Sequence, residues 1–218
     1  MTFEVILLAL ASTIRPTSLA AVYTLLSSPA PRRLMIAYVI AGLTFTIAFG
    51  ALVVWAFHGI AVSSGTDRAK GIADIVGSMI VLGFAALVIT GRISGPHADA
   101  PRAPGRWGQL LDKHRTVKTA ALAGPATHIP GIFYLVALNV VVAHHTSVAA
   151  GIVEILLYNV IWFALPITAL TICIVQPDAA RTVVGGVADW ARHRARTILV
   201  VLSLGIGIVL LVHGLITI

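Results

Sequence analysis

Long apolar segments, separated by short polar ones, run through the whole chain. A helix that crosses a bilayer needs about 20 mostly apolar residues. The stretches close to that length are, in chain order, Phe3–Leu26, Met35–Phe57, Gly71–Thr90, Thr119–Ala143, Ser147–Val175 and Thr197–Ile218. Each is apolar nearly all round, as expected of a helix that is buried or sits in lipid. The pattern therefore predicts an all-α integral membrane protein with six transmembrane helices.

The six predicted helices divide into two groups of three. Residues 91–116 between them contain prolines, glycines and charges of both signs, which indicates a flexible linker. An odd number of helices in each half makes the second half enter the membrane from the opposite side, which is the geometry of an inverted repeat. We expect a first repeat over residues 1–90 and a second over residues 117–218.

Basic residues predict the orientation of the chain. The connections after helices two and four hold only Arg68 and Lys70. The connections after helices one, three and five hold Arg32, Arg33, Arg92, Arg102, Arg106, Lys113, Arg115, Lys118, Arg181, Arg192, Arg194 and Arg196. Because cytoplasmic loops are enriched in Lys and Arg, we expect these three connections inside and both termini outside an inner membrane. The formal net charge of +7 then reflects topology and gives no argument for a nucleic-acid partner.

The first apolar stretch is interrupted near its middle by Arg15 and Pro16. An arginine at mid-membrane costs at least about 2.5 kcal/mol to insert. Proline removes a backbone donor and clashes with the carbonyl one turn earlier, so the helix should break where the charge lies. Freed backbone groups and a cation are tolerated at that depth only inside protein or beside a water-lined cavity. We therefore predict a transport site around Arg15.

The fourth stretch carries a second break, where Pro125 and Pro130 flank His128. We expect this break to face the Arg15 break near the midplane, so that helices one and four are both broken. His128 could relay a proton near neutral pH. It could equally do no more than bond a backbone carbonyl that one of the prolines has freed, and the sequence leaves both readings open.

Helix five contributes Glu154, Asn159 and a third candidate break at Pro166. We name Glu154 as the ionic partner of Arg15 on the transport route, because each charge lowers the cost of burying the other. A purely structural ion pair is the alternative. Asn159, and Asn139 of helix four, are interpreted as residues that hydrogen-bond between helices, with a place on the transport route as the alternative.

Two polar features mark the predicted outer ends of helices. Asp74 falls in the first turn of a helix expected to begin at Gly71, where a carboxylate favours the positive helix end. We interpret it as a plain N-terminal charge rather than a transport residue. His144 and His145 fall in a short outer turn, where a surface pair is favoured over metal ligands.

An amphipathic segment over residues 178–195 precedes the last predicted span. Val183, Val187 and Trp190 share one helical face, and Arg181, Arg192 and Arg194 supply nearby cations. This composition favours a helix on the anionic cytoplasmic surface of the membrane.

Signatures of enzymes and of cofactor sites are missing from the sequence. It contains no Gly-x-Ser-x-Gly, no His-Glu-x-x-His and no P-loop. Cys173 is the single cysteine, so neither a disulfide nor a cysteine metal cluster is available. We expect no enzyme activity, no cofactor and no resident metal. Any transport must use a gradient, passive exchange or energy from a partner.

Several short motifs resemble a known family: Leu25–Arg33, Gly124-Pro125, Tyr134–Leu138, Ala188–Arg194 and Gly205–Gly214. Together they resemble the actinobacterial GAP family, the glycopeptidolipid-addressing and sulfolipid-addressing (Sap-like) membrane proteins, which are similar in turn to the LysE exporter superfamily. The resemblance covers nearly all of the chain. It implies a six-helix transporter of mycobacteria or their relatives that helps cell-envelope lipids cross the cytoplasmic membrane, alongside large lipid pumps of the MmpL type. It supplies no site residues, so Arg15, His128 and Glu154 rest on their own chemistry.

Three functions remain open at the level of sequence. In the first, a lipid exporter or flippase, Arg15 and the helix ends after the breaks receive an anionic or glycosylated headgroup while the acyl chains stay in lipid. The second is a LysE-type exporter of amino acids or metal ions that uses the same residues. The third is a non-transporting assembly factor for an MmpL-type pump.

Overall fold

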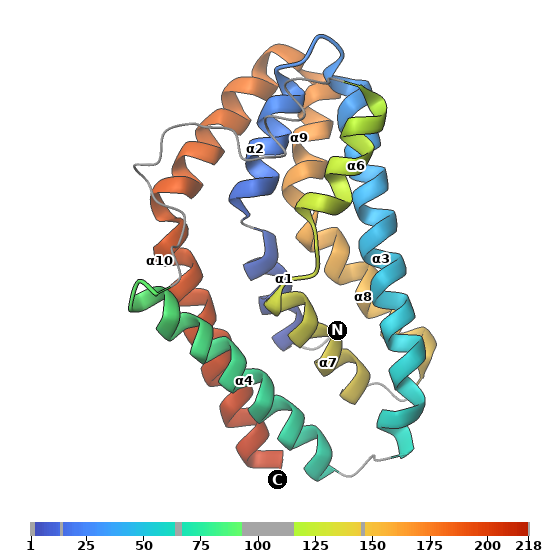
Figure 1. The fold of residues 1–218 in the computed structure, drawn as a ribbon, viewed down its shortest axis with the longest axis vertical. Coiled ribbons are helices and arrows are strands. Elements are labelled where there is room, and N and C mark those ends of the chain that lie inside the picture. Colours follow the sequence, from blue (N-terminus) through green and yellow to red (C-terminus); the bar gives the residue numbers. More distant parts are fainter. Residues whose placement is uncertain (1–2, 14, 64–66, 93–115, 145–146, 218) are drawn as a thin grey trace.

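The computed structural model describes residues 3–13, 15–63, 67–92, 116–144 and 147–217. Within these ranges every regular element is a helix (Figure 1). In chain order the helices are α1 (Phe3–Thr13), α2 (Pro16–Leu26), α3 (Pro31–Ser63), α4 (Asp67–Ile89), α6 (Val117–Thr127), α7 (Ile132–His144), α8 (Val148–Trp162), α9 (Ala164–Val175) and α10 (Pro177–Thr217). Most of the linker expected over residues 91–116 lies outside the described ranges.

Three pairs of consecutive helices meet at sharp bends. The angle is 67° between α6 and α7 and 57° between α8 and α9, and α1 and α2 also meet at more than 40°. α2 begins at Pro16, and Pro130 lies between α6 and α7, so the breaks expected in helices one and four are confirmed. The bend in helix five falls at Phe163, shortly before Pro166, because a proline disturbs the turn that precedes it.

The helices are long and apolar enough for a membrane protein. Residues Pro31–Phe57 of α3 and Thr197–Thr217 of α10 could each cross a bilayer alone, and the number of candidate spans rises to as many as five if each bent pair counts as one. The apolar part of α4, Asp74–Ile89, is shorter. Large apolar side chains are exposed over the outside of the bundle, as a lipid-facing surface requires; examples are Leu52, Trp55, Met79, Leu122, Val160 and Ile216.

Two boundaries differ from expectation. α4 begins at Asp67, one turn before Gly71, so Asp74 lies past the first turn and is buried rather than placed as an N-terminal charge. The segment 178–195 is not a separate helix, because α10 continues unbroken for 41 residues to Thr217. At a rise of 1.5 Å per residue α10 is about 60 Å long, roughly twice the thickness of the hydrocarbon core.

Two buried apolar clusters divide the bundle along its length. One is built from α1, α7 and α8 with parts of α3, α4 and α10. The other is built from α2, α6 and α9 with the first turns of α3 and α10. Each cluster therefore takes one half of every bent pair, which brings all three bends to the level between the clusters. The ends of α2, α6 and α9 that point away from the bends gather at the upper end of the molecule, and the C-terminus lies at the lower end (Figure 1).

Candidate functional site

Residues from all three bends meet around Arg15. Arg15 separates α1 from α2, and its Nη1 donates to the carbonyl oxygens of Thr127, at 3.3 Å, and Ile129, at 3.0 Å, in the bend between α6 and α7. Its guanidinium carbon lies 5.3 Å from the ring centroid of Trp162, the last residue of α8. The expectation that the first and second breaks face each other is confirmed, and the third joins them.

The end of α6 explains why a cation is stable there. The last carbonyls of a helix have no partner within the helix and carry partial negative charge. Arg15 supplies donors to this end of α6, and the electron-rich face of Trp162 adds a cation–π contact. Arg15 stays partly exposed, and its Nη2 stands close to Gly131, where an added Cβ would lie only 2.9 Å away.

His128 is buried and bonded on both ring nitrogens. Nδ1 lies 3.0 Å from the carbonyl oxygen of Gly124. A carbonyl only accepts, so Nδ1 carries the proton and Nε2 accepts from the Ser18 hydroxyl at 3.4 Å. The Gly124 carbonyl is available because the backbone N–H of His128 donates to Pro125 instead. The geometry therefore shows a histidine that bonds a carbonyl left free at the end of α6, rather than one that Pro125 or Pro130 deprives of its donor, and proton relay stays a prediction.

A buried set of hydroxyl groups extends from His128 to α3. The Thr127 hydroxyl donates to Ala123, at 2.8 Å, and lies 2.8 Å from the Tyr38 hydroxyl, which in turn lies 3.1 Å from Ser18. The Phe163 ring stacks on His128, with centroids 4.0 Å apart. The hydroxyl groups of this set are thus buried but hydrogen-bonded, which fixes α2, α3 and α6 relative to one another.

Glu154 lies in a different part of α8. It is buried and precedes Trp162 by two helical turns, so about 12 Å along the axis separates it from the residue on which Arg15 rests. The hydrogen bonds that the structure gives Arg15 go to backbone carbonyls. The ion pair between Arg15 and Glu154 stays a prediction.

The two asparagines have different surroundings. Asn159 is buried, and its Nδ2 donates to Ile155, at 2.8 Å, and to the Tyr134 hydroxyl, at 3.5 Å. Tyr134 donates in turn to the Thr46 carbonyl at 2.7 Å. Asn159 therefore links α8 through α7 to α3, which confirms the interhelical interpretation. Asn139 is exposed on α7.

The first half of α10 has one apolar face inside the bundle and another outside it. Ala180 and Val184 are buried in the cluster that contains α2. Val183, Val187 and Trp190 are exposed, as a face that meets the membrane surface would be. Arg194 is exposed as well, and the side chains of Arg181 and Arg192 lie outside the described part of the chain.

Sequence reasoning did not single out Trp162, Tyr38, Ser18 or Gly131 as site residues. Trp162 carried a usable signal, since it stands shortly before Pro166 in an apolar run. Tyr38, Ser18 and Gly131 carried none, because their roles depend on contacts between distant parts of the chain.

Comparison with known proteins identifies the family of the chain. A family model described as Sap, sulfolipid-1-addressing protein, matches residues 5–216. Since the match covers almost the whole chain, the protein belongs to this family, and the resemblance to the sulfolipid-addressing (Sap-like) proteins is confirmed. Comparison with curated proteins and with solved structures gives no match.

Proposed function

From its place in the sulfolipid-addressing family, we propose that the protein moves cell-envelope lipids or glycolipids across the cytoplasmic membrane and receives the headgroup at Arg15. The family description supports a role in lipid transport or localisation. The exposed apolar surface supports a site that lipid can approach from the bilayer. The convergence of three helix bends on one cation supports a site at depth.

The proposal rests on the hydrogen bonds and the exposure of the Arg15 side chain. Within the described part of the chain its two side-chain hydrogen bonds both run from Nη1, so Nη2 and Nε keep donors for another acceptor. The side chain is partly exposed and held in position by Trp162. A guanidinium whose Nη2 and Nε both keep free N–H bonds matches the paired oxygens of a sulfate, phosphate or carboxylate. An anionic headgroup is therefore the expected occupant.

We also propose the inverted 3+3 arrangement for the whole chain. α10 packs on α2, α4 packs on α7, and α4 and α10 pack on each other. In an inverted repeat, α4 corresponds to α10 and α2 corresponds to α7. The contact between α10 and α2 then corresponds to the contact between α4 and α7, and the contact between α4 and α10 corresponds to itself. Transport involves no enzymatic step in this scheme, and an MmpL-type pump is the proposed partner that accepts the lipid.

Purified protein in proteoliposomes tests the function. The probes are fluorescent phosphatidylglycerol, which is anionic, and phosphatidylcholine, which is not. Hydrogen bonds to charged groups contribute about 1.5–3 kcal/mol, so Arg15→Gln should slow transfer of phosphatidylglycerol about 10- to 100-fold. Arg33→Gln, at an exposed arginine outside the site, should leave the rate unchanged.

A second variant displaces the Arg15 guanidinium without removing its charge. In Gly131→Ala the new methyl group would approach Nη2 of Arg15, which is the movable end of a flexible side chain. The guanidinium should therefore shift while the fold stays intact, with transfer reduced and the melting temperature nearly unchanged. Gly83→Ala, with open space at its Cβ, is the matched control.

Other results would favour the other functions. Export of amino acids or metal ions without any lipid transfer would point to a LysE-type exporter. A protein that is inactive in vesicles, yet needed in cells for lipid export by a pump, would be an assembly factor.

A further inference from the structure

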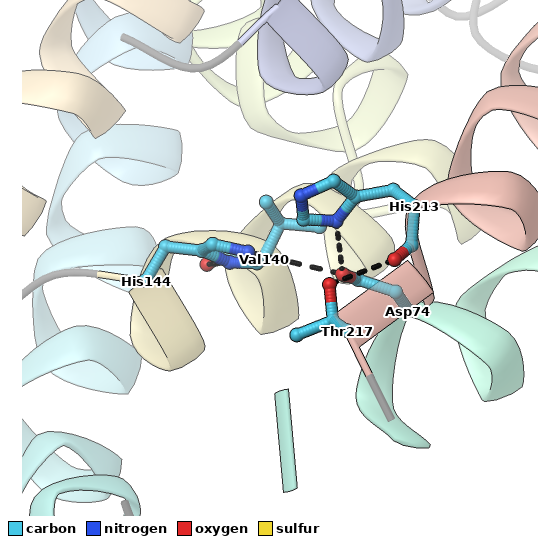
Figure 2. Close-up of polar contacts among 5 residues, drawn as sticks. All are labelled: Asp74, Val140, His144, His213 and Thr217. Carbon is cyan, nitrogen blue, oxygen red and sulfur yellow. Dashed lines mark hydrogen bonds and ion pairs between the residues drawn. The ribbon is translucent and has the colours of Figure 1, made fainter. Parts of the chain in front are cut away.

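Asp74, His144 and His213 come together from three helices (Figure 2). His144 is the last residue of α7, so the cluster lies at the end of α7 opposite the bend that contacts Arg15. Asp74 belongs to α4, His144 to α7 and His213 to α10. Nδ1 of His213 lies 2.8 Å from Oδ2 of Asp74, and Nε2 of His144 lies 3.8 Å from the same oxygen. One ligand atom from each residue falls within 4.8 Å of the others.

Hydrogen bonding fixes which ring nitrogen of His144 faces Asp74. Nδ1 of His144 lies 2.9 Å from the carbonyl oxygen of Val140, which only accepts, so Nδ1 carries the proton. In neutral His144, Nε2 then presents a lone pair toward the Asp74 carboxylate. Two acceptors in this position repel each other unless a proton or a metal ion lies between them.

Asp74 supplies the second, independent observation. Its side chain is 1% exposed, and within the described part of the chain its Oδ1 is buried without a hydrogen-bond partner. A buried carboxylate oxygen without a partner costs free energy. The His213 bond satisfies only Oδ2. The site thus holds a negative charge that its hydrogen bonds do not fully compensate.

We propose that these three side chains bind a divalent transition-metal ion, with Zn²⁺ the best match. Two imidazole nitrogens and one carboxylate oxygen form a common zinc ligand set. Ligand atoms around tetrahedral zinc lie about 3.3 Å apart, so the observed spacings need only small side-chain shifts. His213 and His144 are 43% and 20% exposed, which gives an ion access from outside and leaves room for water as the fourth ligand.

The proposed ion would tie the two halves of the protein together. α4 belongs to the first half of the chain, and α7 and α10 belong to the second. The site is separate from the Arg15 region and does not depend on the proposed transport of lipid. It replaces the surface-pair interpretation for His144, whereas His145 lies outside the described residues.

Zinc binding by the purified full-length protein tests this proposal. The protein should carry an affinity tag without histidine, and titration calorimetry with ZnCl₂ should give one site per chain. Co²⁺ in place of Zn²⁺ should give the visible spectrum of a four-coordinate ion. Removing a direct ligand should cost at least the 10- to 100-fold in affinity known for residues that only support ligands.

Two ligand variants and one control locate the ion. Asp74→Asn and His213→Gln should each lower zinc affinity about 100-fold or more and abolish the Co²⁺ spectrum. His193→Gln, at an exposed histidine whose Nδ1 bonds the Asp189 carbonyl, should change neither. His213→Gln keeps the test decisive if Asp74→Asn does not fold, because His213 is the more exposed partner. Absence of zinc binding by the unchanged protein, or full affinity in His213→Gln, would overturn the proposal.

Discussion

Arg15 and the end of α6 stabilise each other: the carbonyls offset the cost of burying the cation, and the cation offsets the cost of burying unpaired carbonyls. A guanidinium within a membrane helix is expensive, and so are the carbonyls of Thr127 and Ile129, which have lost their helical donors. The two hydrogen bonds from Nη1 satisfy these oxygens and surround the cation with partial negative charge. A carboxylate partner is therefore not needed to make the arginine stable, which leaves it able to accept an anion.

A double-mutant cycle on Arg15 and Glu154 follows from this arrangement. Arg15→Met leaves two carbonyls without a donor, and Glu154→Gln removes a buried charge two helical turns from Trp162. Sites more than about 7–10 Å apart with no shared partner add within about 0.5 kcal/mol. We expect the free energies of unfolding, measured in detergent, to add in the double variant.

The sequence-based hypothesis of an ion pair predicts the opposite result, namely free energies of unfolding that do not add. Removing one partner of a buried pair costs about 3–5 kcal/mol, and removing both restores much of that stability. Recovery of folding in the double variant would establish the pair and contradict additivity.

Ionisable site residues could be predicted from the sequence because an ionisable residue inside an apolar run is conspicuous. Arg15 and His128 were identified in this way. Trp162 and Tyr38 were not, since aromatic side chains are common in membrane helices and their contacts bridge distant parts of the chain. The pairing of Asp74 with His213 was not predicted, because it joins residues of α4 and α10 that lie 139 positions apart in the sequence.

At the scale of the elements, breaks were predictable where proline marks them, and helix continuity was not. Pro16 and Pro130 mark two of the bends, and the third bend, at Phe163, lies shortly before Pro166. The boundary expected before Thr197 rested only on a change from amphipathic to fully apolar sequence. Neither glycine nor proline interrupts α10 at that point, so nothing stops the helix and it runs on to Thr217.

Close approach between α3 and α6 gives a prediction for Gly124. A Cβ on Gly124 would meet the carbonyl oxygen of Tyr38 and come within 2.8 Å of the Gly42 backbone nitrogen. Backbone atoms cannot turn aside as side chains can, so Gly124→Ala should force the helices apart. Overpacking of this kind costs about 1–3 kcal/mol, which denaturation in detergent would measure.

Gly205→Ala in α10 is the matched control for Gly124, since its Cβ would meet open space. It should leave stability unchanged or raise it by up to about 1 kcal/mol, because alanine favours the helix. Equal effects at the two positions would mean that the contact between α3 and α6 is not tight.

At the scale of the whole molecule, the two apolar clusters explain why the bends share one level. Each cluster holds one half of α1–α2, of α6–α7 and of α8–α9. The helical pattern and the bends that proline marks could be predicted from the sequence. The common level could not, because it arises from packing between segments that lie over a hundred residues apart.

Orientation is the remaining whole-molecule prediction, and it rests on where the basic residues fall. Ala30 lies in the exposed connection between α2 and α3, beside Arg32 and Arg33, whereas Ser147 caps the start of α8 in a connection that carries no Lys or Arg. The positive-inside rule places Ala30 in the cytoplasm and Ser147 outside. In a Cys173→Ala background, Ser147→Cys should react with a membrane-impermeant thiol reagent in intact cells. Ala30→Cys should react only after the cells are opened, and the reverse pattern would invert the topology and place the amphipathic half of α10 on the outer surface.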